Sequence, residues 1–166
     1  MSRLGSLVFA LGIGVTWASA HGATFTVTNT NDSGAGSLRD AIAQASVSPS
    51  PNTVNFATGV TGSIILTTGQ LNIAGPMSIV GPGTSSLTID ANANGRVFSI
   101  GTTFPACPTL DNNGLDYLVS ISGFKLTNGR RGTSNVAGAI YTEHSLTLDS
   151  VNIENSMAAS GGGVGF

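Results

Sequence analysis

Apolar and polar residues alternate along most of the chain after residue 53, in short runs separated by Gly, Pro, Asn and Ser. A period of two is typical of strands that bury one face. Such strands are expected around Ile64 and Leu66, Leu71 and Ile73, Met77 and Ile79, Leu87 and Ile89, and Val97, Phe98 and Ile100. They begin six to ten residues apart, and this spacing suits either the coils of a β-helix or the strands of a sandwich.

A repeat occurs near the C-terminal end, where five positions return as similar residues 27 positions later. The pairs are Val119 and Leu146, Ile121 and Leu148, Phe124 and Val151, Leu126 and Ile153, and Asn128 and Asn155. A fixed period of this length is typical of stacked solenoids. We expect the two asparagines to occupy the same turn and to form a hydrogen-bonded ladder. Binding of a sugar or a metal by their side chains is the alternative.

The same period occurs earlier in the chain when one insertion is set aside. Ser78–Gly81 recurs as Ser120–Gly123 at a spacing of 42, and the 15-residue polar stretch Thr102–Asp116 lies between them. Without that stretch the spacing is again 27. A solenoid accepts insertions as loops, whereas a sandwich gives no reason for the repeat. The sequence therefore predicts an all-β fold, a right-handed parallel β-helix.

The segment before these coils has a different pattern. Thr24–Asn29 alternates as a strand, and Ser37 followed by Asp40 indicates the start of a helix, because serine caps helices and an acid favours their positive end. One face of this helix would carry Leu38, Ala41, Ile42 and Ala45. We interpret Ser37–Ala45 as a short α-helix that caps the first coil. A connecting helix on the side of the coils is the alternative.

The first 20 residues have the features of a signal peptide. Arg3 gives a positive start, Leu4–Trp17 is apolar, and Ala18–Ala20 has the small residues that a signal peptidase accepts. We expect cleavage there, with an uncleaved anchor as the alternative. The predicted domains are then a signal peptide at 1–20, a cap at 21–52 and coils at 53–166. The last coil shows no cap, so the chain is expected to be a truncated product that self-associates through it.

Composition narrows the functional classes. Only 8% of the residues are charged, and the formal net charge is −2, so there is no basic footprint for nucleic acid. The 23 glycines suit a fold with many tight turns. The single cysteine, Cys107, cannot form an internal disulfide and is interpreted as an incidental loop residue. A reactive or intermolecular thiol is the alternative.

Candidate chemistry is sparse. Asp90, Asp149 and Glu154 are separated in sequence, whereas a lyase would need clustered carboxylates for calcium and a glycosidase a facing pair. The segment Asp90–Gly95 matches the first half of an EF-hand loop, but Gly101 stands where the bidentate glutamate is required. A polar turn is the better interpretation. No catalytic, cofactor-binding or metal-binding residue is therefore predicted.

Two further polar pairs are interpreted as solvated. Arg130 and Arg131 follow Asn128 in a turn, with a role in substrate binding as the alternative. Glu143 and His144 lie between expected strands, with His144 acting as a base as the alternative.

Two parts of the chain resemble a known group of proteins. One is the run from Thr24 to Ile42, which contains Val-Thr-Asn-Thr-Asn-Asp-Ser-Gly-Ala-Gly-Ser-Leu-Arg-Asp-Ala-Ile. The other is the pair of coil segments Ser120–Gly129 and Gly138–Tyr141. Together they are similar to large exported bacterial right-handed parallel β-helix repeat proteins, which share the pectate-lyase-like superfold and include polymorphic outer-membrane proteins.

The resemblance implies an exported protein located at the cell surface, in the outer membrane or outside the cell. We expect a non-catalytic adhesin-like or structural role, with host or cell-surface glycans or proteins as partners, no cofactor, and no membrane span in the mature chain. The alternatives are the N-terminal part of a polysaccharide lyase or glycoside hydrolase, and a carbohydrate-binding module. Fold resemblance alone does not choose among them.

Overall fold

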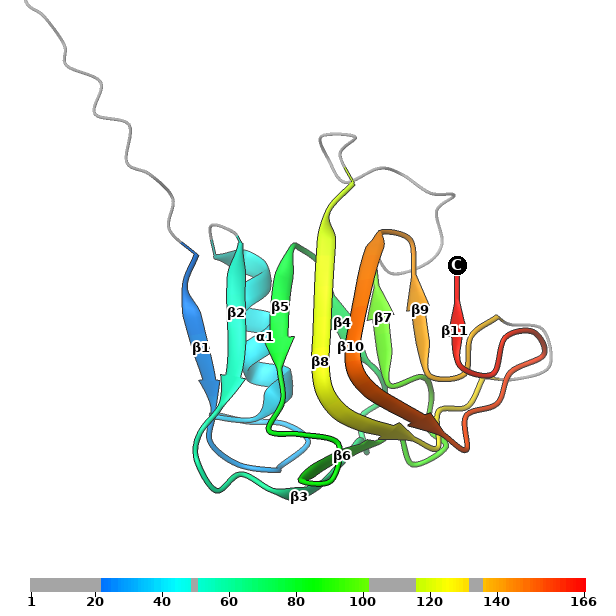
Figure 1. The fold of residues 1–166 in the computed structure, drawn as a ribbon, viewed down its shortest axis with the longest axis horizontal. Helices are drawn as coiled ribbons and strands as arrows, with labels where there is room; N and C mark the ends of the chain where they lie inside the picture. Colours follow the sequence, from blue (N-terminus) through cyan, green and yellow to red (C-terminus); the bar gives the residue numbers. More distant parts are fainter. Residues whose placement is uncertain (1–21, 49–50, 102–115, 132–135) are drawn as a thin grey trace, which may run out of the picture.

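The computed structural model describes residues 22–48, 51–101, 116–131 and 136–166. These residues form a parallel β-solenoid of about five turns, with one short helix near its N-terminal end (Figure 1). The fold class predicted from the alternation and the repeat is thereby confirmed. The predictions for the signal peptide and for Cys107 lie outside the described residues.

The described elements follow the expected runs closely. The strands before the insertion are β1 (Thr24–Val27), β2 (Asn52–Phe56), β3 (Gly62–Ile65), β4 (Leu71–Ile73), β5 (Met77–Val80), β6 (Leu87–Asp90) and β7 (Phe98–Ile100). Those after it are β8 (Leu118–Thr127), β9 (Ile140–Thr142), β10 (Ser145–Glu154) and β11 (Val164–Gly165). The helix is α1 (Leu38–Val47). Each strand expected from the alternation is present.

The strands form three walls of the solenoid. The first wall stacks β1, β2, β5 and the first halves of β8 and β10. The second stacks β3, β6 and the second halves of β8 and β10, because both long strands bend from one wall into the next (Figure 1). The third stacks β4, β7, β9 and β11. Every pairing is parallel, so equivalent residues of successive coils lie above one another.

The register confirms the 27-residue repeat. Leu146 pairs with Val119, and the equivalent pairing continues along the strand to Glu154 and Thr127. The insertion is also confirmed as an interruption of the same period, because Ile79 pairs with Ile121 across it. Inward side chains of successive coils therefore form continuous apolar columns, one of which consists of Phe25, Val54, Ile79, Ile121 and Leu148.

The predicted core residues of β8 are fully enclosed, whereas their equivalents in β10 are not. Val119, Ile121, Phe124 and Leu126 are all 0% exposed. Leu146, Leu148, Val151 and Ile153 are only partly buried against the same core. Among the described strands, β10 pairs with β8 on one side and with none on the other. Self-association through this face stays a prediction.

The bend between the first two walls brings two backbones very close together. Gly123 has a φ of 72° at the bend of β8, and Gly81 donates its N–H to the carbonyl of Ser122 at 2.8 Å. A Cβ added at Gly81 would collide with the carbonyl oxygen of Gly123 and with the ring of Phe124. Glycine is required here because one of those groups is backbone and cannot move away.

Replacing Gly81 by Ala is expected to lower the free energy of unfolding by about 2 kcal/mol, because the coil must shift to relieve the overlap. Urea denaturation of the purified variant measures this loss. Gly75→Ala is the control. A Cβ added at Gly75 would lie 3.8 Å from the carbonyl oxygen of Ser46, its nearest contact, so the new methyl group needs no rearrangement. Equal losses in the two variants would contradict the proposed crowding.

The helix begins where the sequence predicts and covers the start of the solenoid. Ser37 is the N-cap, and its hydroxyl accepts the N–H of Asp40 at 3.2 Å. The buried residues of α1 are the four expected ones, Leu38, Ala41, Ile42 and Ala45. The helix packs against β1, β2 and β4 (Figure 1), so it shields the apolar interior next to β4, an edge strand of the third wall. Burial of Leu38 and Ile42 contributes about 1.5 to 3 kcal/mol each.

The end of α1 is held by a residue that the sequence analysis missed. Asn52, which is 1% exposed, donates its side-chain N–H groups to the carbonyls of Ala45 at 2.7 Å and Ser48 at 3.1 Å. Its side-chain oxygen accepts the N–H of Ala23 at 2.9 Å. One buried amide therefore joins the helix, β2 and the residue before β1.

None of the described helices is long and apolar enough to cross a bilayer.

Candidate binding site at a corner of the coils

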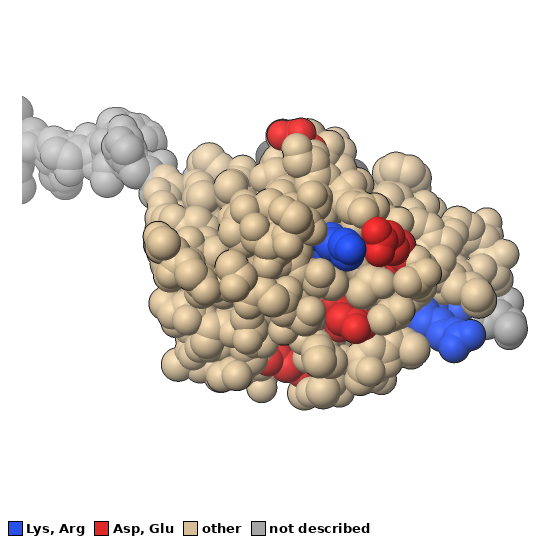
Figure 2. All heavy atoms as spheres, turned by 60° about the horizontal axis from the view of Figure 1, so that its bottom comes forward, with Lys and Arg blue, Asp and Glu red and all other residues tan. Residues whose placement is uncertain are grey.

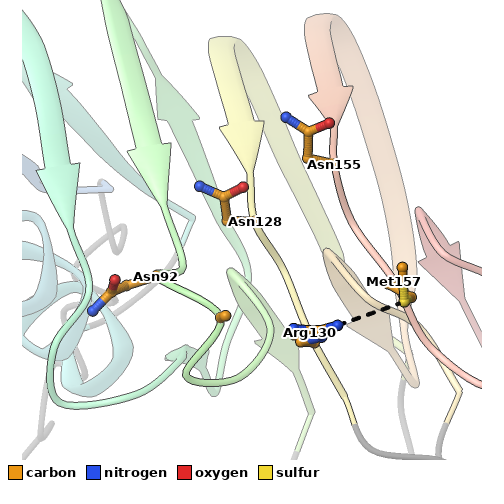
Figure 3. Close-up of a pocket in the computed structure, with 6 residues that line it drawn as sticks. Asn92, Asn128, Arg130, Asn155 and Met157 are labelled. Carbon is orange, nitrogen blue, oxygen red and sulfur yellow. Dashed lines mark hydrogen bonds between the residues drawn. The ribbon is translucent and has the colours of Figure 1, made fainter.

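Asparagines mark one corner of successive coils. Asn128 and Asn155 follow the paired residues Thr127 and Glu154, which confirms that they occupy equivalent positions, and Asn92 lies in the adjacent turn after β6 (Figure 3). Their φ angles are 56°, 49° and 54°. Asparagine tolerates this left-handed conformation better than most residues. The left-handed turns of this corner are therefore occupied by residues whose side chains are amides.

A carboxylate connects two of these turns. One side-chain oxygen of Asp90 accepts the backbone N–H of Asn92 at 2.7 Å and the side-chain N–H of Asn128 at 2.9 Å. The link between the coils of β6 and β8 is thus an acid–amide pair. A hydrogen-bonded ladder between Asn128 and Asn155 stays a prediction. The Asp90–Gly95 segment is a turn between β6 and β7, which agrees with the structural interpretation of the calcium-like motif.

A hollow of about 330 Å³ lies at this corner (Figure 3). It is lined by Asn92, Ala93, Asn128, Arg130, Asn155 and Met157. The amides both donate and accept hydrogen bonds, the guanidinium only donates, and the thioether offers apolar surface. These six side chains include no hydroxyl, thiol, imidazole or carboxylate. The lining offers a polar ligand both hydrogen-bond donors and acceptors.

Charged side chains are few on the face of the molecule that carries this corner (Figure 2). In Figure 2 the lower side of the molecule comes forward, and only a few acidic and basic side chains interrupt it. Lys125 and Glu154 form an ion pair at 3.5 Å, with 34% and 42% of their side chains exposed. A pair this exposed contributes little to stability. Asp90, Asp149 and Glu154 are not part of any metal-binding group of three or more His, Cys, Asp or Glu in the described ranges.

His144 belongs to a structural cluster before β10 and is not solvated as expected. Its side chain is 7% exposed and stacks on Tyr117 with ring centroids 3.7 Å apart. Its Nδ1 lies 3.3 Å from Asp116, whose carboxylate also accepts the hydroxyl of Ser145 and, at 3.0 Å, its backbone N–H. Hydrogen bonds from Ser145 hold the pKa of Asp116 below its usual range. The predicted solvation of His144 is therefore wrong, because its ring is stacked and largely buried. Its alternative role as a base stays a prediction.

Asp116, His144 and Ser145 are not arranged in the order of a catalytic triad. In a triad the histidine lies between the hydroxyl and the carboxylate, so that it can remove the hydroxyl proton. Here the hydroxyl of Ser145 donates directly to Asp116. The carboxylate therefore fixes the turn that leads into β10, and the ring of His144 does not lie between it and the hydroxyl of Ser145.

A second polar cluster covers the third wall. Arg96 is 7% exposed and donates to the carbonyls of Ala137 at 3.1 Å and Val136 at 2.9 Å, with its guanidinium 4.7 Å from the ring centroid of Tyr141. The hydroxyl of Tyr141 donates to Glu143 at 3.1 Å. Burial, together with the nearby carboxylate, raises the pKa of Tyr141. These groups hold neighbouring coils together.

The segment that carried the family resemblance forms a clamp that the sequence analysis did not identify. Asp32, with a side chain 9% exposed, pairs with Arg39 at 2.7 Å. Its other carboxylate oxygen accepts the N–H and hydroxyl groups of Thr67 and Thr68 at 2.7 to 3.1 Å. Arg39 also donates to the carbonyls of Gly69 and Gln70. The clamp joins the loop before α1 to the turn before β4.

The electrostatic consequence of the clamp is a stabilised carboxylate. Burial by itself raises the pKa of Asp32, but the hydrogen bonds from Arg39, Thr68 and Thr67 outweigh it and hold the pKa well below the usual range. Asp32 therefore stays ionised in the folded protein even in acid. In the sequence, the two charged residues of the clamp lie in the run Asp-Ser-Gly-Ala-Gly-Ser-Leu-Arg. Nothing in that run indicated that it contacts the turn with Thr67 and Thr68.

The fold and the corner hollow define the protein as a parallel β-solenoid with a polar pocket at one corner. Comparison of the chain with models of protein families, with curated proteins and with solved structures gave no match.

Proposed function

We propose that the protein is a non-catalytic β-solenoid that is exported and acts at the bacterial cell surface or outside the cell as an adhesin-like or structural scaffold. The observation that carries this proposal is the use of its polar groups. Asp32, Asp116 and His144 all hold turns through direct contacts. The signal-peptide features of residues 1–20 support export. The partly exposed apolar row of β10 supports contact with a second copy of the chain.

Location is tested by producing the full chain with a C-terminal tag in a bacterial host. We expect the mature protein to begin near His21 by mass spectrometry and to react with a membrane-impermeant label on intact cells or in the medium. Retention of the first 20 residues together with labelling only after cell lysis would contradict export. A cytosolic marker protein in the same cells controls for lysis.

A second candidate function is carbohydrate binding, and the corner hollow is the observation that favours it. Amide side chains bind sugar hydroxyls because each can donate and accept. Asn128 and Asn155 follow paired residues of neighbouring coils, and such coils are separated by about 4.8 Å, so these two amides form a row along the solenoid. A row of this kind suits a chain of sugar units better than a single small molecule.

Binding and catalysis are separated by one set of experiments on the purified chain. A glycan array reports binding, and incubation with acidic and neutral polysaccharides, with and without calcium, reports cleavage. Binding without cleavage supports the second candidate. Release of shortened chains would overturn the non-catalytic proposal and favour a polysaccharide lyase or glycoside hydrolase.

A further inference from the structure

Positive charge is distributed unevenly over the described residues. Arg39 and Lys125 are paired with Asp32 and Glu154. The other three cations, Arg96, Arg130 and Arg131, have no carboxylate within 4.0 Å in the described part of the chain. All three lie at one corner, because the backbone N–H of Arg130 donates to the carbonyl of Gly95 at 2.7 Å. We call this group the arginine corner.

One member of the arginine corner is fixed and the other two are free to meet a ligand. Arg96 is held by two carbonyls and the ring of Tyr141. Burial lowers the pKa of Arg96, and the positive charge of Arg131 lowers it further. Arg130 and Arg131 are exposed. Like charges gathered without a carboxylate create a positive potential that an anion would relieve.

Arg130 connects this charge to the hollow. It lines the hollow beside Asn128 and Asn155, and its guanidinium has one side-chain contact, to the sulfur of Met157 at 4.0 Å (Figure 3). Sulfur is a weak acceptor, so the donors of Arg130 remain available. The carboxylate of Asp90, in the adjacent turn, is already bonded to Asn92 and Asn128.

We propose that the arginine corner and the adjoining amides form a binding site for an oxyanion group, a carboxylate or a sulfate, carried on a hydroxyl-rich ligand such as an acidic sugar. Arg130 provides paired N–H donors whose geometry fits such a group. Asn92, Asn128 and Asn155 bind the neutral part of the ligand. This inference rests on the second candidate function, because it specifies the charge of the ligand in the same hollow.

Three sugars that share the glucose ring distinguish the effect of the ligand's charge on binding from the effect of its shape. Glucose, glucuronate and glucose 6-sulfate are titrated into the isotope-labelled full chain, with sodium sulfate as a fourth probe, and amide chemical shifts are followed by NMR. We expect both charged sugars to bind at least about tenfold more tightly than glucose, with the largest shifts at residues 128–131. Their affinity should fall as salt is raised.

Two variants locate the site. Arg130→Gln removes an exposed charge without a buried contact and should weaken binding of the charged sugars about tenfold. Lys125→Gln, which removes a cation elsewhere, should leave it unchanged. Equal binding of glucose and glucuronate, or equal effects of the two variants, would overturn the anion site and leave carbohydrate binding standing. Binding of sodium sulfate alone would support the anion site and argue against the sugar ligand. Shifts with none of the four probes would overturn the inference.

Discussion

Replacing Leu126 by Ala is expected to lower the free energy of unfolding by about 4 kcal/mol, because the side chain is 0% exposed and lies between two other coils. Its backbone neighbours in the stack are Ile89 and Ile153. The cavity would be enclosed on both sides and could not fill by collapse. Urea denaturation followed by far-ultraviolet circular dichroism measures the loss.

The repeat supplies a control with identical chemistry. Leu148→Ala removes the same atoms from an inward position of the next coil, but that side chain is only partly buried. We expect a loss of about half as much or less, because water already reaches the site. Similar losses at the two positions would show that β10 is covered in solution, and would argue that its apolar row is occupied by another molecule.

The second large effect is expected at the clamp before α1. Asp32→Asn should lower the free energy of unfolding at neutral pH by about 3 kcal/mol, because it leaves the charge of Arg39 uncompensated and removes acceptor capacity for Thr67 and Thr68. Asp149→Asn is the control: Asp149 is an exposed acid whose recorded side-chain contact is with Ser150. This substitution should change the free energy of unfolding by no more than about 0.5 kcal/mol.

The pH dependence gives the clamp a separate signature. The folded pKa of Asp32 lies below the unfolded value, so its contribution is fully present above about pH 5 and is lost as the pH falls below about 4. The difference in stability between the wild-type protein and Asp32→Asn should therefore shrink from about pH 5 to about pH 3. If the difference in stability stays constant over this range, the ionised form of Asp32 does not stabilise the clamp.

The fold was predictable because its signals are local and repeated. Alternation located the strands, and the return of Val119, Ile121 and Phe124 after 27 residues set the register between coils. The helix was predictable from a serine cap and one apolar face. Each of these signals depends on residues close together in the sequence or on a strict period.

The contacts between turns were not predictable in the same way. Asp32 meets Thr67 and Thr68 across 35 and 36 residues, and His144 meets Asp116 across 28. Both pairs depend on how the coils stack and not on any local pattern. The hollow at the corner has the same origin, because it combines the turns after β6, β8 and β10. Sequence alone indicated the corner asparagines and the arginine pair, but not that they share one surface.

The spacing between β5 and β8 has a consequence for how this molecule can change over time. Their paired residues are 42 positions apart, whereas those of β8 and β10 are 27 apart. Because closure entropy grows only with the logarithm of loop length, the longer connection costs about 0.4 kcal/mol more. A single buried methylene group offsets this amount. The connection before β8 can therefore change in length at little cost in closure entropy while the apolar columns keep their alignment, so new sequence can be added there with little effect on folding.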